Sequence, residues 1–165
     1  MADEINLENL NTKAFFQRLQ KGECFQDALG WSDELMNELY DCLKELNTLG
    51  RWDEAIDAST FLLTVNPFIG SFYVEAGYAY QNKQCLEEAI SLYSLGTLHS
   101  VEDPQPFLYL VTCYQTLGDP ENATKALESA ILLIEQGPSQ QWANLLPDLK
   151  ETLSTLKEPH GSPSI

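Results

Sequence analysis

The fold of this chain is decided by a segment that occurs three times: Gly50-Arg-Trp-Asp-Glu-Ala-Ile, Gln84-Cys-Leu-Glu-Glu-Ala-Ile and Gly118-Asp-Pro-Glu-Asn-Ala-Thr. The copies begin at residues 50, 84 and 118, so they align at intervals of 34 residues without a gap. A fixed period of this length indicates a repeat architecture, in which each unit is one supersecondary motif. Large side chains upstream of the segment also coincide in the alignment: Leu39, Tyr73 and Phe107, then Leu46, Tyr80 and Tyr114.

Each unit is predicted to be a hairpin of two helices. Apolar residues at positions 4, 7, 8 and 11 of the repeat fall on one face of the first helix. Gly50 and Gly118 favour a left-handed turn after it, and acidic residues such as Asp53 and Glu87 favour the start of the second helix. Small residues stand where the two helices approach most closely: Ala55, Ala89 and Ala123. The pattern resembles the tetratricopeptide repeat.

We therefore predict an all-α fold, a superhelix of three tetratricopeptide-like repeats with capping helices at both ends. Ser32 is a suitable N-cap for the first repeat helix. A helix from Asn9 to Lys21 is expected before the repeats, and an apolar stripe that includes Trp142 and Leu153 predicts a final helix over 139–157 that covers the last repeat. The predicted units are an N-terminal segment 1–35, repeats 36–69, 70–103 and 104–137, a C-terminal capping helix 138–158 and a flexible tail 159–165.

The charge excludes several classes of partner. The sequence contains nine Lys and Arg residues and 25 Asp and Glu residues, which gives a net charge of −16. Such a chain repels phosphate backbones and anionic lipid, so we expect no nucleic-acid or membrane partner. The N-terminus carries no basic, apolar targeting signal. The four cysteines form no CxxC pair and no metal-ligand spacing, so we expect reduced thiols in a cytosolic protein and neither a metal nor a cofactor.

Enzyme motifs are also missing from the sequence. It contains no glycine-rich phosphate loop, no GxSxG and no HExxH. His99 is the single histidine within the predicted repeats, and general bases are most often histidines. A Ser/His/Asp triad stays open, because its members meet in space rather than in sequence. We expect a binding module and no enzyme.

A binding surface is predicted on the concave side of the superhelix, which the first helix of each unit lines. Positions 2, 5, 9 and 12 form a stripe beside the packed positions, and none of its twelve residues is acidic. The stripe gives these candidates for a peptide-binding groove: Tyr40, Lys44, Asn47, Ser71, Val74, Tyr78, Gln81, Leu108, Thr112 and Gln115, with Asn37 and Gln105 completing it. Exposed apolar and amide groups suit an extended peptide with hydrophobic anchors. The alternative is that Tyr40, Val74, Tyr78 and Leu108 are half-buried packing residues.

The same helices speak against a carboxylate clamp of the kind found in co-chaperones. That clamp needs Lys and Asn at positions 5 and 9 of the first unit, Asn at position 6 of the second, and Lys and Arg at positions 2 and 6 of the third. This chain has Tyr40, Lys44, Glu75, Gln105 and Tyr109 there, so it lacks the positive charge that binds a terminal carboxylate.

Several local segments point to one branch of these repeat proteins. They are Ser32-Asp-Glu-Leu-Met-Asn-Glu-Leu-Tyr40, Leu49-Gly-Arg-Trp-Asp-Glu-Ala-Ile56, Ala89-Ile-Ser-Leu-Tyr-Ser-Leu-Gly96 and Glu102-Asp-Pro-Gln-Pro-Phe107. Together with the length, the three flanked repeats and the acidic character, they resemble the class II chaperones of bacterial type III secretion. The resemblance spans residues 15–135.

The resemblance implies a function. Such chaperones act in the bacterial cytoplasm in virulence-related secretion, where they bind hydrophobic translocator proteins and keep them from aggregating. Their groove takes an extended segment with a Pro-x-Leu-x-x-Pro pattern, and their N-terminal region often forms a homodimer, for which Phe15, Phe16 and Leu19 are the candidates here. Those three residues could instead cap the first repeat. The alternative function is a scaffold or adaptor subunit of a multi-protein assembly, such as the secretion apparatus.

Overall fold

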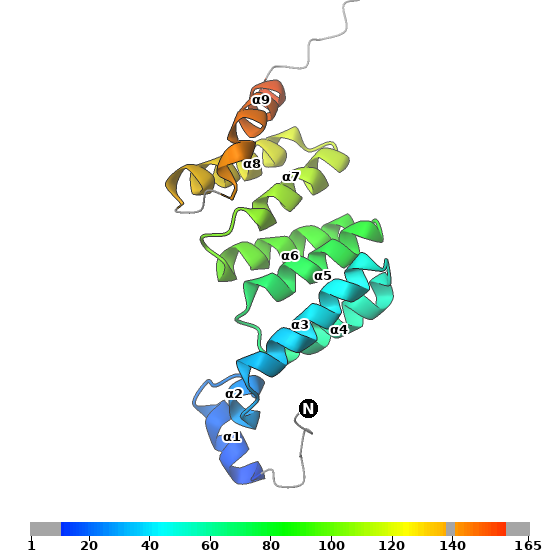
Figure 1. The fold of residues 1–165 in the computed structure, drawn as a ribbon. Coiled ribbons are helices and arrows are strands. Elements are labelled where there is room, and N and C mark those ends of the chain that lie inside the picture. Colours follow the sequence, from blue (N-terminus) through cyan, green and yellow to red (C-terminus); the bar gives the residue numbers. More distant parts are fainter. Residues whose placement is uncertain (1–10, 138–140, 158–165) are drawn as a thin grey trace, which may run out of the picture.

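The computed structural model describes residues 11–137 and 141–157, and the regular elements in these ranges are all helical. In chain order they are α1 (Thr12–Gln20), α2 (Phe25–Leu29), α3 (Asp33–Thr48), α4 (Trp52–Val65), α5 (Gly70–Asn82), α6 (Leu86–His99), α7 (Gln105–Thr116), α8 (Pro120–Gln136), the 3₁₀ turn η2 (Ala143–Leu145) and α9 (Leu146–Lys157). Helices α3 to α8 stack one after another along the molecule, with α1 and α2 at one end and α9 at the other (Figure 1). The predicted all-α, helical-hairpin fold is confirmed.

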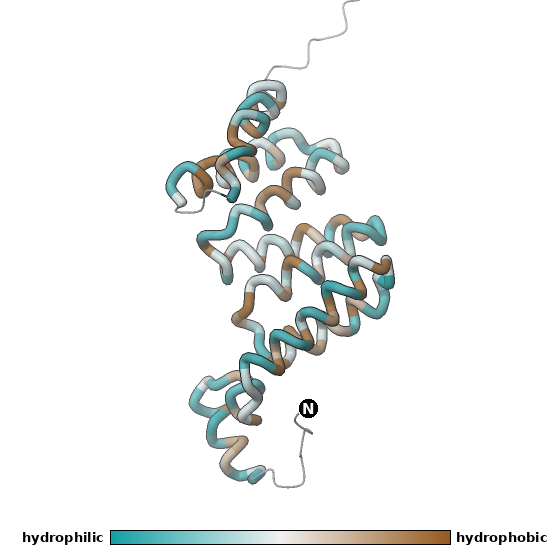
Figure 2. Tube along the Cα trace, viewed as in Figure 1, coloured by the Kyte–Doolittle hydropathy of each residue, from teal (hydrophilic) through white to brown (hydrophobic). Residues whose placement is uncertain are grey.

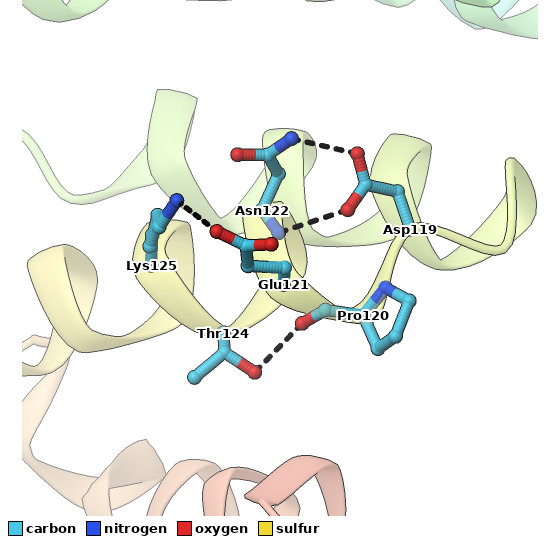
Figure 3. Close-up of polar contacts among 6 residues, drawn as sticks. All are labelled: Asp119, Pro120, Glu121, Asn122, Thr124 and Lys125. Atoms are coloured by element: carbon cyan, nitrogen blue, oxygen red, sulfur yellow. Dashed lines mark hydrogen bonds and ion pairs between the residues drawn. The ribbon is translucent and has the colours of Figure 1, made fainter.

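The helix starts follow local hydrogen-bonding rules. The side chain of Ser32 accepts a bond of 3.2 Å from the backbone N–H of Leu35, which confirms it as the N-cap of α3. At the start of α8, the Asp119 carboxylate accepts bonds from the backbone N–H of Asn122 at 3.0 Å and from its side chain at 2.6 Å (Figure 3). The bond from the backbone N–H of Asn122 lowers the pKa of Asp119, so the cap is a carboxylate at neutral pH.

The turn inside each hairpin uses one left-handed residue. Gly50 and Gly118 both have φ of 71°, as the sequence predicts. The equivalent residue of the second hairpin is Gln84, which has φ of 63° and is the non-glycine residue with positive φ in the described part of the chain. An L-residue in this conformation is destabilised because its Cβ crowds the following carbonyl oxygen.

Replacing Gln84 by Gly should therefore stabilise the protein by about 1 kcal/mol. The reciprocal change, Gly118→Gln, should destabilise it by a similar amount, since an added Cβ at Gly118 meets no atom within 4 Å and only the backbone conformation is at stake. Urea unfolding of the two variants measures both changes. A loss of stability in Gln84→Gly would contradict this account of the turn.

Two apolar clusters form the core, and each joins neighbouring repeats. One contains Leu43 of α3, Leu62 of α4 and Phe72 of α5, and the other contains Tyr93 of α6 and Leu127 of α8. The repeat alanines Ala55, Ala89 and Ala123 are fully buried. A Cβ added at Gly77 of α5 would lie 2.7 Å from the ring of Tyr93, so a glycine is needed where α5 crosses α6.

The N-terminal end of the stack contains a helix that the sequence pattern did not predict. After α1, the chain forms the five-residue helix α2, which covers the first repeat. Its buried Gln26 donates to Asp33 at 2.8 Å and accepts from Asn66 at 2.7 Å, so one amide joins the start of α3 to the end of α4. This amide fixes the cap on the repeat.

The C-terminal helix begins later than predicted. Residues 138–140 lie outside the described residues, and the chain then forms η2 before α9 starts at Leu146, not at 139. Pro147 follows directly, and proline is favoured in the first turn of a helix because it has no N–H to satisfy. The leucines at 146, 149, 153 and 156 pack against the second core cluster, so α9 covers the last repeat as expected.

Hydrophobic and hydrophilic stretches alternate along the helices of the stack (Figure 2). This alternation is typical of amphipathic helices that each bury one face. Among the described helices, none combines the length and the apolar character needed to cross a membrane.

Candidate functional site

The first helices of the three hairpins share one face of the molecule. The Tyr40 hydroxyl of α3 donates to Glu75 of α5 at 3.4 Å. The ring of Tyr78 on α5 lies 5.9 Å from that of Tyr109 on α7. We call the surface formed by Tyr40, Glu75, Tyr78, Gln105 and Tyr109 the first-helix face; all five side chains are half-buried.

Glu75 lies at the centre of this face. One of its carboxylate oxygens accepts the bond from Tyr40, and the other accepts from the side-chain Nδ2 of Asn47 at 2.6 Å. The same Nδ2 also donates to the backbone carbonyl of Glu75 at 3.1 Å. The Asn47 side chain is thus drawn inward, and its Oδ1 is buried without a hydrogen-bond partner in the described structure. Asn47 and Glu75 together connect the first two repeats.

Tyr40 and Tyr109 remain protonated at neutral pH, because the pKa of each is raised. Burial, and secondly the negative charge of Glu75, raise the pKa of Tyr40 to about 12. Burial also raises the pKa of Tyr109, to which Glu75 contributes again. The Tyr93 ring stacks on that of Tyr109 at 5.0 Å, and its hydroxyl donates to Gln81 at 2.7 Å. The face therefore offers aromatic rings and neutral hydroxyls beside the carboxylate of Glu75, and the charge of Asp103 also acts on Tyr40 and Tyr109.

The structure brings some of the predicted groove residues together. Lys44 lies over the ring of Tyr40, with Nζ 4.8 Å from the centroid, and pairs with Asp41 at 2.7 Å. Ser71, on α5, lowers the pKa of Tyr40 in part, against the larger effects of burial and of Glu75 that raise it. Tyr78 packs edge-on against Trp52 and also contacts the ring of Tyr109.

Other predicted residues lie differently. Asn47 is 4% exposed and Val74 is 6% exposed, because Asn47 bonds Glu75 and Val74 packs in the second core cluster. In the free protein they support the first-helix face and offer little surface to a ligand. Leu108 is half-buried, and Thr112 and Gln115 are exposed farther along α7.

Sequence reasoning passed over Glu75 and Tyr109 as binding residues. Both stand at position 6 of their repeats. The predicted stripe contains positions 2, 5, 9 and 12 and therefore omits them. The available signal was that position 6 contributes to the clamp in related repeats. The structure thus adds an acidic side chain to a surface expected to have none.

The candidate dimerisation residues lie on α1. The Phe15 ring contacts Phe16 at 5.5 Å and Phe25 of α2 at 5.7 Å. Phe16 is 61% exposed, and Leu19 is half-buried. The buried link to the first repeat is made by Gln26 of α2. Phe16 of α1 lies on the surface.

The face has the chemistry of a recognition surface. No group of three or more His, Cys, Asp or Glu side chains in the described ranges is arranged to hold a metal. Half-buried tyrosines present apolar area together with a polar tip, which is typical of residues that dominate binding energies. The arrangement therefore suits a peptide that lies across α3, α5 and α7.

Solved structures of type III secretion chaperones have the same fold. The chain matches the crystal structure of a T3SS complex from Aeromonas hydrophila with a TM-score of 0.77 and 24% identity, over 88% of this chain and 95% of that one. It matches PcrH from Pseudomonas aeruginosa in complex with the chaperone binding region of PopD with a TM-score of 0.70 and 23% identity. This match covers 77% of this chain and 94% of PcrH. It matches the type III secretion translocator chaperone SycD from Yersinia enterocolitica with a TM-score of 0.73 and 19% identity, over 81% and 98%.

No protein-family model and no curated protein matches the amino-acid sequence. At identities below 25% the structural likeness establishes the fold. The resemblance to translocator chaperones that the sequence segments suggested is confirmed at this level: the structural neighbours include the translocator chaperone SycD and PcrH bound to the chaperone binding region of PopD.

The link between Asn47 and Glu75 should contribute measurably to stability. Asn47→Ala removes two hydrogen bonds in a buried place, so it should lower the free energy of unfolding by about 1–2 kcal/mol. The matched control is Gln115→Ala, because Gln115 is an exposed amide at the same position of the third repeat; a surface change of this kind is usually within about 0.5 kcal/mol. Equal urea midpoints for the two variants would show that the link carries no stability.

Proposed function

We propose that this protein is a cytoplasmic chaperone of bacterial type III secretion, which binds an extended segment of a hydrophobic translocator protein. The observation that carries the proposal is the set of half-buried tyrosines shared by α3, α5 and α7 on a fold of this kind. The likeness to PcrH in complex with the chaperone binding region of PopD, and to SycD in complex with a peptide of YopD, supports it. A binding role needs no catalytic group.

The bound segment is proposed to have a Pro-x-Leu-x-x-Pro pattern and to lie on the first-helix face. Proline has a fixed φ, so such a segment loses little backbone entropy when it is held in an extended form. A buried leucine side chain supplies about 1.5–3 kcal/mol. The net charge of −16 would keep a complex with an apolar client in solution.

Substitution of Tyr78 should abolish much of this binding. Tyr78→Ala removes aromatic area from the face and should weaken the affinity for a labelled Pro-x-Leu-x-x-Pro peptide about tenfold, as expected of a central aromatic residue. Fluorescence anisotropy measures the affinity, and circular dichroism checks that the helices persist.

The control for this experiment is Tyr80→Ala. Tyr80 is a half-buried tyrosine on the same helix, but it lines a cavity of about 300 Å³ between α4 and α6 on another side of the molecule. Its removal should leave peptide affinity within about twofold, since it lies outside the proposed contact surface. If Tyr80→Ala weakened binding and Tyr78→Ala did not, the client would occupy the other side.

We also propose that α1 carries a homodimer contact through Phe16, with Phe15 and Leu19 beside it. The exposed side chain of Phe16 on α1 supports this assignment, as does the existence of an alternative dimer of SycD.

Phe16→Glu should therefore convert a dimer into a monomer, because a charge cannot be buried in an apolar contact without a partner. Phe68→Glu is the matched control, since Phe68 is also 61% exposed but lies between α4 and α5. Light scattering after size-exclusion chromatography gives the mass of each variant. A dimer that survives Phe16→Glu would place the contact elsewhere.

A further inference from the structure

The first-helix face contains a negative charge that no basic side chain of the described residues neutralises. Each ion pair found in these residues joins other groups, and none involves Glu75. Its hydrogen-bond donors, the Tyr40 hydroxyl and the Asn47 amide, are both neutral. An ionised carboxylate can accept about four hydrogen bonds, so Glu75 has capacity left for a charged donor.

Lys44 is the basic residue on the predicted groove stripe of the first repeat, but it does not pair with Glu75. Its ammonium pairs with Asp41 and lies over the ring of Tyr40. This contact demonstrates that the Tyr40 ring can accept a cation on its face. Lys44 itself is exposed, which leaves the half-buried carboxylate without a counter-ion.

The aromatic side chains around Glu75 add to its preference for positive charge. The ring of Tyr78 on α5 lies 5.9 Å from that of Tyr109 on α7, and the Tyr40 hydroxyl on α3 donates to Glu75. The negative charge of Glu75 contributes to the raised pKa of both Tyr40 and Tyr109, after burial, which agrees with this placement. Aromatic faces attract ammonium and guanidinium groups, and the attraction is stronger where the site is desolvated.

The positions involved are those that bind a carboxylate in clamp-type repeats, but a carboxylate stands where the clamp of the second repeat has a neutral amide. Tyr40, Lys44, Glu75, Gln105 and Tyr109 occupy the places where a clamp has Lys, Asn, Asn, Lys and Arg. A clamp concentrates positive charge to hold an anion. Here the central group of the same constellation is an anion surrounded by π-systems, so the complementary ligand is a cation.

We propose that Glu75 is a specificity-determining residue that selects client segments with a lysine or arginine beside the apolar anchors. Its carboxylate pairs with the ammonium or guanidinium, while Tyr78 and Tyr109 cover the aliphatic part of the side chain. This inference rests on the proposed function, because it assumes that the client lies on the first-helix face. The inference adds that the client segment carries a positive charge and that Glu75 recognises this charge.

The test uses three families of labelled peptides with a Pro-x-Leu-x-x-Pro frame and alanine at the variable positions. In each family one variable position carries Lys, Gln or Glu. At one of the three positions, the full-length protein should bind the Lys peptide about tenfold more tightly than the Gln peptide, and the Glu peptide should bind most weakly. Fluorescence anisotropy at 150 mM salt limits the contribution of distant charges.

Glu75→Gln isolates the role of the carboxylate. Within this variant, the preference for Lys over Gln should fall below twofold, and the ratio of the two affinities is the quantity compared with the unaltered protein. Glu88→Gln is the control, because it removes the same charge from an exposed site on α6. It should keep the full preference, which separates local recognition from the general attraction of a −16 protein for basic peptides.

The outcomes are distinguishable. Tenfold selectivity that Glu75→Gln removes and Glu88→Gln keeps would support the inference. Equal binding of the Lys and Gln peptides at every position, or equal loss of selectivity in both variants, would overturn it and leave the proposed function intact. Failure of all peptides to bind would overturn the proposed function and this inference with it.

Discussion

No hairpin of this protein can bury its apolar face alone, and the rest of the structure depends on that constraint. Each hairpin has hydrophobic residues toward both neighbours, so the core forms only where units stack: one cluster joins α3 and α4 to α5, and the other joins α5 and α6 to α7 and α8. The fully buried alanines Ala55, Ala89 and Ala123 let paired helices approach. The ends of the stack then need covers, which α2 and α9 supply.

The stacking that builds the core also creates the candidate binding surface. When the units repeat with a fixed geometry, the first helices fall side by side, and side chains 35 residues apart, such as Tyr40 and Glu75, come into hydrogen-bond range. Side chains of neighbouring first helices contact each other at two places. Asn47 and Glu75 tie two repeats together, and Tyr78 with Tyr109 continues the surface onto the third. Stability and recognition are therefore supported by overlapping residues, and the polar contacts that hold the repeats also orient the central carboxylate.

The parts of this structure that local physics controls could be predicted from the sequence. The period of 34 residues and the apolar face of each first helix define the hairpins, and Ser32 caps α3 as its side chain allows. Other features depend on distant partners. The five residues of α2 are too few to give a helical period, and its register depends on the contacts of Gln26 with Asp33 and Asn66. Asn47 was expected on an open stripe, but Glu75, 28 residues away, draws it inward. Whether the residue at position 6 lies on the first-helix face depends on the angle between neighbouring repeats. The sequence of a single repeat does not determine this angle.

The central claim is that the face shared by α3, α5 and α7 holds the client segment. Site-specific photo-crosslinking tests it most directly, with a photoreactive residue in place of Thr112 on α7 or, for comparison, in place of Ser91 on α6. Both positions are exposed, so each tolerates the probe, but only Thr112 belongs to the helices of the proposed face. The account predicts that a Pro-x-Leu-x-x-Pro peptide is captured from position 112 and not from position 91. Capture from position 91 alone, or equally from both, would contradict it.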